Sequence, residues 1–217
     1  MAVLSIWRWA FVSLLRSQLA WGTGLSLFGS ILLLDRLRPL PSEAGSLDVT
    51  LAWTHPAALI GVSLGLMALS SGAAFLARVE ASTRALGELG ALLLAALCLQ
   101  IPIFAGALLS GAAPADLGRS LPAILTADLQ LASAAALFLL PELSTAVRTS
   151  LFLTGVVLVP ALCARDARLA PLSAFLDAGA LLRRPVREAL LPTLAAGVSL
   201  ALAGCLLRTG HARGPSA

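Results

Sequence analysis

Six long apolar stretches separated by short polar segments dominate the hydrophobic pattern of this chain. A bilayer core about 30 Å thick requires roughly 20 mostly apolar residues in a helix. No gap between the stretches is long enough to hold a soluble domain. The pattern predicts an all-α integral membrane protein with one domain, residues 19–207, and a short polar tail, residues 208–217. About six transmembrane helices are expected, near residues 19–34, 56–77, 89–109, 121–140, 148–164 and 189–207.

The first 18 residues follow a different pattern. Trp7 and Trp9 flank Arg8, and Arg16 lies two helical turns after Arg8 on the same face. Trp and Arg together favour the interface between membrane and water. We therefore predict an N-terminal amphipathic interfacial helix over residues 1–18. The alternative is an overlong first span whose arginines extend back to the headgroups. A signal peptide is not expected, because the arginines interrupt the apolar run and no small-residue cleavage site follows.

The polar connections between the apolar stretches differ in length and composition. Asp35–His55 is long, and Ser110–Ser120 is a loop rich in Gly, Pro and Ala. Arg78–Glu88 contains residues that favour helix, so a short polar helix is expected between the second and third spans. Arg165–Glu188 encloses the apolar patch Ala170–Leu182.

The distribution of arginine does not decide the orientation in the membrane. With the N-terminus in the cytoplasm, seven arginines fall on the cytoplasmic side and eight on the other. The N-terminal segment is usually the stronger determinant. In addition, Asp35, Glu43 and Asp48 offset the arginines of the first outer loop. We therefore favour a cytoplasmic N-terminus.

Composition excludes much of the usual chemistry. Hydrophobic residues make up 59% of the 217 residues and charged residues 12%, about half the charged share of a soluble domain. The chain has no Lys, so it can form neither a phosphate loop with its lysine nor a Schiff base. The two His and three Cys show no metal-ligand spacing, and no metal or cofactor is expected. The net charge of +4 comes from arginines scattered between the spans, so nucleic acid is not an expected partner.

One carboxylate and two carboxamide side chains fall inside predicted spans. Gln100 lies in the third span, and Asp128 and Gln130 lie in the fourth. Because such residues are expensive to bury in a bilayer, they are candidates for a translocation path. Asp128 could hold a proton or an ion, but a hydrogen bond between helices is favoured. It also lies about two turns from the start of its predicted span, from where it could reach the headgroups.

Small residues suggest either catalysis or close helix packing. Gly24, Leu25 and Ser26 resemble the nucleophile motif of an intramembrane serine protease. The base would have to be His55 or His211, and neither lies within a predicted span, so an enzyme is not expected. Small residues at a spacing of four, as in Gly61–Gly65, more simply indicate close contact between helices.

The layout as a whole resembles that of a known transporter family. Its features are the Trp7-Arg8 pair followed by Leu14-Leu15-Arg16-Ser17, six spans, and a polar segment between the second and third spans. An apolar stretch that could dip into the membrane, Ala170–Leu182, precedes the last span. The chain is similar in this to the membrane subunits of ABC-2-type transporters, which include haem-exporter-type permeases. The acidic-Gly-Thr/Ser-Leu-Glu signature of that family is not found in Arg78–Glu88.

The resemblance implies a permease subunit of an ATP-driven exporter in the bacterial inner (plasma) membrane. Two permease chains, alike or different, would form the translocation path as a dimer, powered by a separate ATP-binding cassette ATPase subunit. The polar helix would dock on that ATPase as a coupling helix, with Arg78, Glu80, Arg84 and Glu88 as contacts.

Two other classes of function remain open at this stage. The chain could be a non-catalytic scaffold or assembly subunit of a larger complex, with its spans acting as interaction surfaces. A secondary transporter would predict inverted repeats between residues 1–110 and 111–217. No convincing internal similarity of that kind is visible in the sequence.

Overall fold

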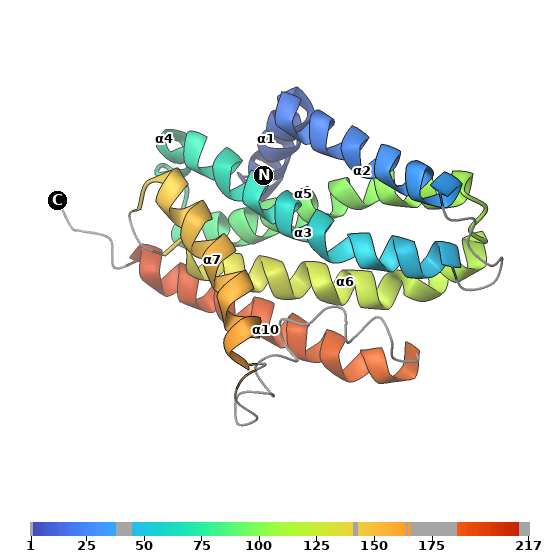
Figure 1. Ribbon diagram of the computed structural model, residues 1–217. Coiled ribbons are helices and arrows are strands. Elements are labelled where there is room, and N and C mark those ends of the chain that lie inside the picture. Colours follow the sequence, from blue (N-terminus) through green and yellow to red (C-terminus); the bar gives the residue numbers. More distant parts are fainter. Residues whose placement is uncertain (1, 38–44, 141–142, 164, 166–185, 213–217) are drawn as a thin grey trace.

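A computed structural model of the chain describes residues 2–37, 45–140, 143–163, 165 and 186–212, and every regular element in this part is a helix (Figure 1). The prediction of an all-α fold is confirmed. In chain order the helices are α1 (Ala2–Arg16), α2 (Gln18–Leu37), α3 (Gly45–Ser71), α4 (Ala73–Leu76), α5 (Ala81–Leu109), α6 (Pro114–Leu137), α7 (Thr145–Cys163) and α10 (Val186–Ala212).

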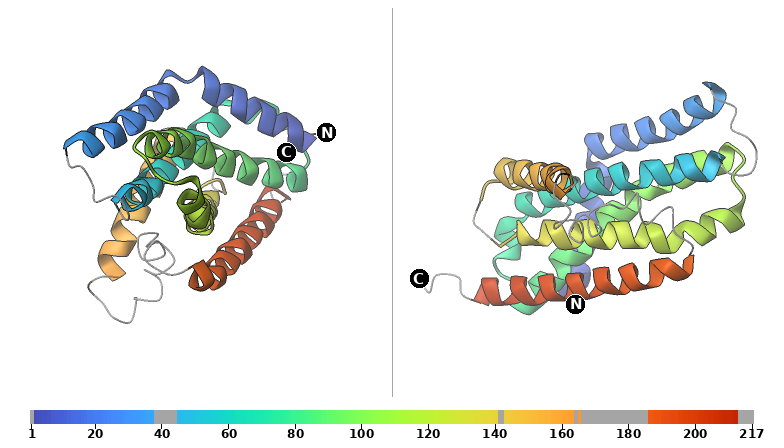
Figure 2. Two further views of the ribbon diagram at one scale, coloured as in Figure 1. Left: turned by 90° about the vertical axis from the view of Figure 1, so that its right-hand side faces the viewer. Right: turned by 60° about the horizontal axis from the view of Figure 1, so that its bottom comes forward.

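Five long helices, α2, α3, α5, α6 and α10, run roughly alongside one another, and α7 crosses the bundle obliquely (Figure 1). The end-on view of Figure 2 shows α5 and α6 near the middle, between α2 on one side and α10 on the other. These two central helices also contain the most buried residues of the described part. The bundle therefore has its core along α5 and α6.

The length of the helices fits a membrane. The 29 residues of α5 extend over about 43 Å at 1.5 Å per residue, more than a bilayer core of about 30 Å. Three helices are long and apolar enough to cross a membrane, namely Trp53–Ser71 of α3, α5 and α6, and the bent pair of α1 and α2 would make a fourth. By length and composition the chain is a helical membrane protein. Six spans stay a prediction that α7 and α10 would have to complete.

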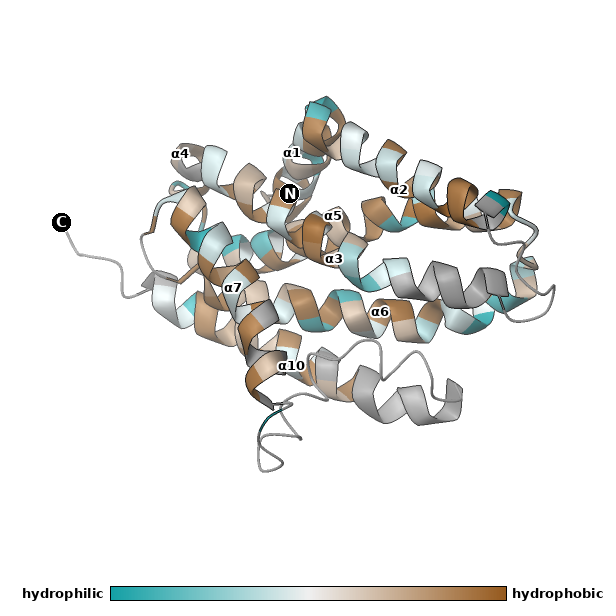
Figure 3. Ribbon diagram, in the orientation of Figure 1, coloured by the Kyte–Doolittle hydropathy of each residue, from teal (hydrophilic) through white to brown (hydrophobic). Residues whose placement is uncertain are grey.

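The surface of the bundle has the same character. Many leucines on its outer faces are more than half exposed, among them Leu25, Leu194 and Leu202. Figure 3 shows polar residues gathered at the turn between α1 and α2 and at the far end of α2. A surface rich in exposed leucine is what contact with lipid requires.

Two helices begin earlier than the sequence predicted. The expected loop Ser110–Ser120 ends at Ala113, because Pro114 starts α6 and Asp116 and Arg119 form an ion pair of 3.3 Å in its first turns. Similarly α3 starts at Gly45, eleven residues before the expected span, and Pro56 lies inside it. The hydropathy pattern marks where a helix is apolar, whereas each of these helices begins in residues ahead of that apolar stretch.

The expected separate polar helix at Arg78–Glu88 is not present as such. After the single turn of α4, residues 77–80 form a bend, and α5 begins at Ala81 and continues without a break to Leu109. Arg84 and Glu88 therefore belong to the first turns of a spanning helix. Residues 170–182, the predicted membrane-dipping stretch, lie outside the described residues.

The turn between α1 and α2 is well defined by local hydrogen bonds. The chain breaks at Ser17, and the two helices meet at a bend of 68°. Ser17 Oγ accepts a hydrogen bond from the Ala20 amide at 3.3 Å, as an N-cap of α2 does. The Trp21 indole N–H donates to the Leu15 carbonyl at 2.8 Å. Residues Ala2–Arg16 therefore form a helix distinct from α2.

Glycine brings α3 and α5 into close contact. A Cβ atom at Gly61 would lie 2.6 Å from Ala96 Cα and 2.7 Å from the Ala95 carbonyl oxygen. At Gly65 it would lie 3.2 Å from Ala95 Cβ. The predicted close contact at Gly61 and Gly65 is therefore confirmed, and it fixes α3 against the central helix.

Candidate functional site

A buried polar cluster joins α3, α5 and α6 inside the bundle. The Gln100 amide donates through Nε2 to Asp128 Oδ1 at 3.1 Å and to the Thr54 carbonyl oxygen at 3.3 Å. Asp128 and Thr54 are fully buried, and Gln100 is 3% exposed. One amide group thus connects three helices in the interior. The hydrogen bond between helices that was favoured for Asp128 is confirmed.

The cluster is rich in acceptor atoms. Gln100 Oε1 and Asp128 Oδ2 are buried and have no hydrogen-bond donor among the described residues. A buried polar atom left without a partner costs about 1–3 kcal/mol. A cation or a hydrogen-bond donor that reached this cluster would meet oxygen atoms from two helices, so the arrangement is suited to such a group.

The expectation that Asp128 could reach the headgroups is wrong. Because α6 starts at Pro114, Asp128 lies 14 residues into the helix, about 21 Å from its beginning. Its side chain is fully buried against Gln100 of α5. The site is therefore deep in the bundle and not at its end.

Gln130, the third predicted path residue, does not join the other two. It lines a different groove of about 290 Å³ between α6 and α10, together with Ser133 and Ser199. Its Oε1 atom is buried without a donor in the described part of the chain. Two residues apart on one helix, Asp128 and Gln130 cannot face the same direction. The structure therefore brings together Gln100 and Asp128 only.

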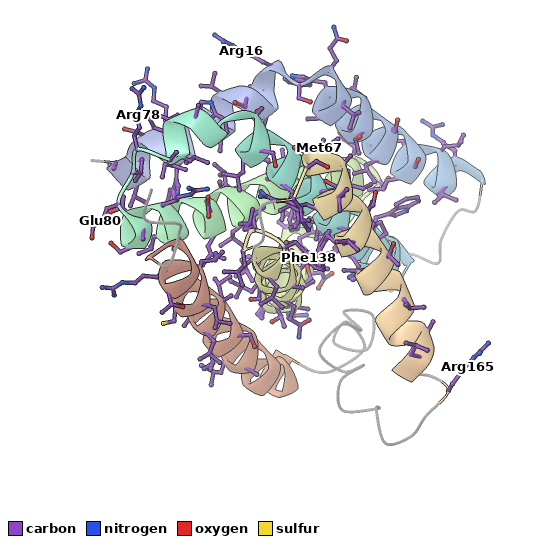
Figure 4. All side chains as sticks on the ribbon, turned by 90° about the vertical axis from the view of Figure 1, so that its left-hand side faces the viewer. Arg16, Met67, Arg78, Glu80, Phe138 and Arg165 are labelled. Carbon is purple, nitrogen blue, oxygen red and sulfur yellow. The ribbon has the colours of Figure 1, made fainter. Side chains whose placement is uncertain are left out.

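The four predicted contact residues for an ATPase divide into two pairs. Arg78 and Glu80 are exposed in the bend before α5, at the end of the bundle that faces the viewer in Figure 4. Glu80 accepts a hydrogen bond from Ser82 Oγ at 2.8 Å. Arg84 Nε donates to Glu88 Oε1 at 2.7 Å, and the Glu88 side chain is only 2% exposed. Glu88 is therefore part of the packed interior, whereas Arg78 and Glu80 form an exposed charged turn.

The predicted interfacial residues lie on α1, which packs across α5. Trp7 seats on Gly90 and Ile6 on Gly87, both near the start of α5, while Trp9 seats on Gly72 beside α4. Arg8 and Arg16 are exposed. The tryptophans thus pack α1 against the bundle, and the two arginines lie on its exposed side.

Sequence reasoning missed these glycine contacts. Gly87 and Gly90 are one turn apart on the same face of α5, and they receive two consecutive side chains of α1. The spacing of the two glycines was visible, but the partner helix was not. Thr54 was also missed, because it takes part through its backbone carbonyl, which any residue type has.

A metal or redox centre gains no support from the arrangement. No group of three His, Cys, Asp or Glu side chains that could hold a metal ion occurs in the ranges the structure describes. Cys98 is partly buried in α5 and Cys205 is exposed on α10, and both are free thiols.

Comparisons with known proteins identify no relative. No protein-family model matches the chain, and neither the curated proteins nor the solved structures include a match. Function therefore has to be argued from the helices and side chains themselves.

Proposed function

We propose that this chain is the membrane-spanning permease subunit of an ATP-driven exporter of the ABC-2 type in a bacterial inner membrane. Two permease chains would form the translocation path, and a separate ATPase subunit would drive it. The chain would have no catalytic residue of its own. In this proposal the exposed charged turn, Arg78 and Glu80, meets the ATPase, and the cluster of Gln100 and Asp128 belongs to the path.

The observation that carries the proposal is the continuity of α5. The charged turn leads directly into a helix that runs unbroken from Ala81 to Leu109 and carries Gln100. Motion imposed on the turn would therefore be transmitted along this one helix to the polar cluster. A solvated loop between two helices would not transmit motion in this way.

The docking of α1 supports the same reading. It packs through Ile6 and Trp7 on α5 within ten residues of the charged turn. The helix α1 lies across α5 and is separated from α2 by a bend of 68°. It can therefore follow a motion of α5 without moving α2 as a rigid body. An ATPase must be separate, because the chain has no lysine for a phosphate loop.

The test is to reverse the charged turn and measure what the protein binds. Arg78→Glu with Glu80→Arg keeps the net charge but reverses each contact with a partner, which interfaces tolerate poorly. The tagged protein is purified from native membranes, and the ATPase that accompanies it is identified and assayed. We expect the reversal to remove the ATPase subunit and its activity. Arg84 is left unchanged, because its loss would leave Glu88 buried without its cation.

A matched control exists at the other end of the bundle. Asp116→Arg with Arg119→Asp reverses an ion pair that is likewise at the surface, and it should leave ATPase binding unchanged. If wild-type protein carries no ATPase and moves a substrate on an ion gradient, the chain is a secondary transporter. If it is recovered with a larger complex that contains no ATPase, it is a scaffold. Either result rejects the proposal.

A further inference from the structure

An apolar groove on the bundle lies between α5 and α10. It has a volume of about 510 Å³, and side chains of α1, α5 and α10 line it. Gly197 leaves open space where another residue would project, while Gly90 and Gly204 let the side chains of Trp7 and Leu89 pack close to the helix backbones. A Cβ atom at Gly197 would meet nothing within 4 Å.

The groove has one polar end and one apolar end. Ser82 and Arg208 lie at the end of the bundle where α5 begins and α10 finishes (Figure 2). Leu93 and Gly197 lie at the inner end. From Ser82 to Leu93 is 11 residues of α5, or about 17 Å along the helix. That length matches one leaflet, which is half of a hydrocarbon core of about 30 Å.

The charge at the polar end favours an anion. Arg208 is exposed and is the only charged residue that lines the groove in the described part. Nearby, the positive charge of Arg84 is compensated by Glu88, and Arg78 and Glu80 are both exposed in the bend. Among these described residues, three arginines against two glutamates leave a net positive charge near the polar end of the groove. Trp7, a residue typical of the membrane interface, also lines the groove.

We propose that this groove binds one anionic phospholipid, with an acyl chain between α5 and α10 and the headgroup phosphate at Arg208. The groove has the length of one leaflet, apolar walls and a cation at its polar end, and these match the acyl chain and phosphate of such a lipid. The lipid would contact α1, α5 and α10 together through Trp7, Gly90 and Gly204. The inference does not depend on the exporter proposal.

The experiment measures which lipid stays bound. Purified protein is incubated with equal amounts of dioleoyl-phosphatidylglycerol and dioleoyl-phosphatidylcholine, and the retained lipids are counted by native mass spectrometry. We expect wild-type protein to retain phosphatidylglycerol about fivefold better, as one arginine near the membrane surface predicts. Arg208→Gln should remove this preference but still retain lipid. Gly197→Leu should lose both lipids, since its side chain fills the groove.

Two control variants separate the groove from general effects. Arg165→Gln removes an exposed arginine at the end of α7, away from α10 (Figure 4), and Gly22→Leu adds a side chain in open space on α2. Both should retain lipid as wild type does. Equal retention of the two lipids by wild type, or an unchanged preference in Arg208→Gln, overturns the proposal. A dimer that Gly197→Leu dissociates would assign the groove to a second copy of the chain and would also overturn it. Arg208→Gln remains decisive if Gly197→Leu does not fold, because Arg208 is exposed.

Discussion

The contribution of the hydrogen bond between Gln100 and Asp128 to stability depends on both side chains. Each side chain is buried, and each also has one oxygen atom without a donor among the described residues. Replacing one of the two side chains leaves the polar atoms of the other buried without a hydrogen-bond partner, which costs free energy of folding. Replacing both side chains removes that cost. The contribution of the pair is therefore better judged from the double variant than from either single one.

We predict that Gln100→Leu destabilises the protein by about 1–3 kcal/mol, because Asp128 then loses its donor in the interior. The double variant Gln100→Leu with Asp128→Leu should recover most of that loss. Unfolding of the purified protein in mixed micelles with increasing denaturing detergent measures both. A double variant less stable than each single variant would mean that the hydrogen bond is not what connects these helices.

At the scale of elements, α1 is held against α5 by close packing of side chains and not by ion pairs. Its arginines are exposed, and its contacts with α5 are Ile6 and Trp7 seated on glycine. Glycine at these positions lets the two helices approach closely. The same feature makes α1 the element that a small change in α5 would displace most readily.

We predict that Gly87→Ala with Gly90→Ala loosens α1, because each added methyl group occupies the place of Ile6 or Trp7. A cysteine introduced at Ala10, which is 2% exposed, reports the loosening in a background without the native cysteines. Its labelling by a maleimide should become about tenfold faster, as overpacking of this kind implies.

The control for that experiment adds the same two methyl groups elsewhere. Gly29→Ala with Gly118→Ala places them where no atom lies within 4 Å. This variant should label at the wild-type rate. Equal acceleration in both variants would show that α1 does not depend on the glycine contacts.

At the scale of the whole molecule, the two ends of the bundle carry different features. The charged turn, the start of α5 and the finish of α10 lie at one end, and the loop between α5 and α6 lies at the other (Figure 1). With a cytoplasmic N-terminus, the first of these ends faces the cytoplasm. An ATPase could reach the turn only in that orientation.

We predict that single cysteines at Ser82 and Thr209 are protected from a membrane-impermeant maleimide in intact cells, and that a cysteine at Ala113 is labelled. Ser82 and Thr209 should react only after the membrane is made permeable. Labelling of Ser82 and Ala113 from the same side would show that α5 does not span the bilayer. Labelling of Ser82 and Thr209 alone in intact cells would reverse the orientation.

Much of the architecture could be read from hydropathy. The apolar stretches predicted helices that are present, because apolar length alone decides which segments can leave water. The small residues at Gly61 and Gly65 likewise predicted a close helix contact that the structure contains. The starts of α3 and α6 could not be placed in this way, since both helices begin in residues ahead of their apolar stretches, where hydropathy gives no signal.

By itself the sequence determined an all-helical membrane protein with no lysine for a phosphate loop, because residue composition and apolar length depend on no partner. Only the tertiary structure decided which polar residues meet. It placed Gln100 beside Asp128 and turned Gln130 towards α10, and it assigned Glu88 to the interior with Arg84. The physical reason is that the rotation of each helix about its axis decides which polar side chains face the interior and which ones meet, and that rotation is set by packing of the whole bundle.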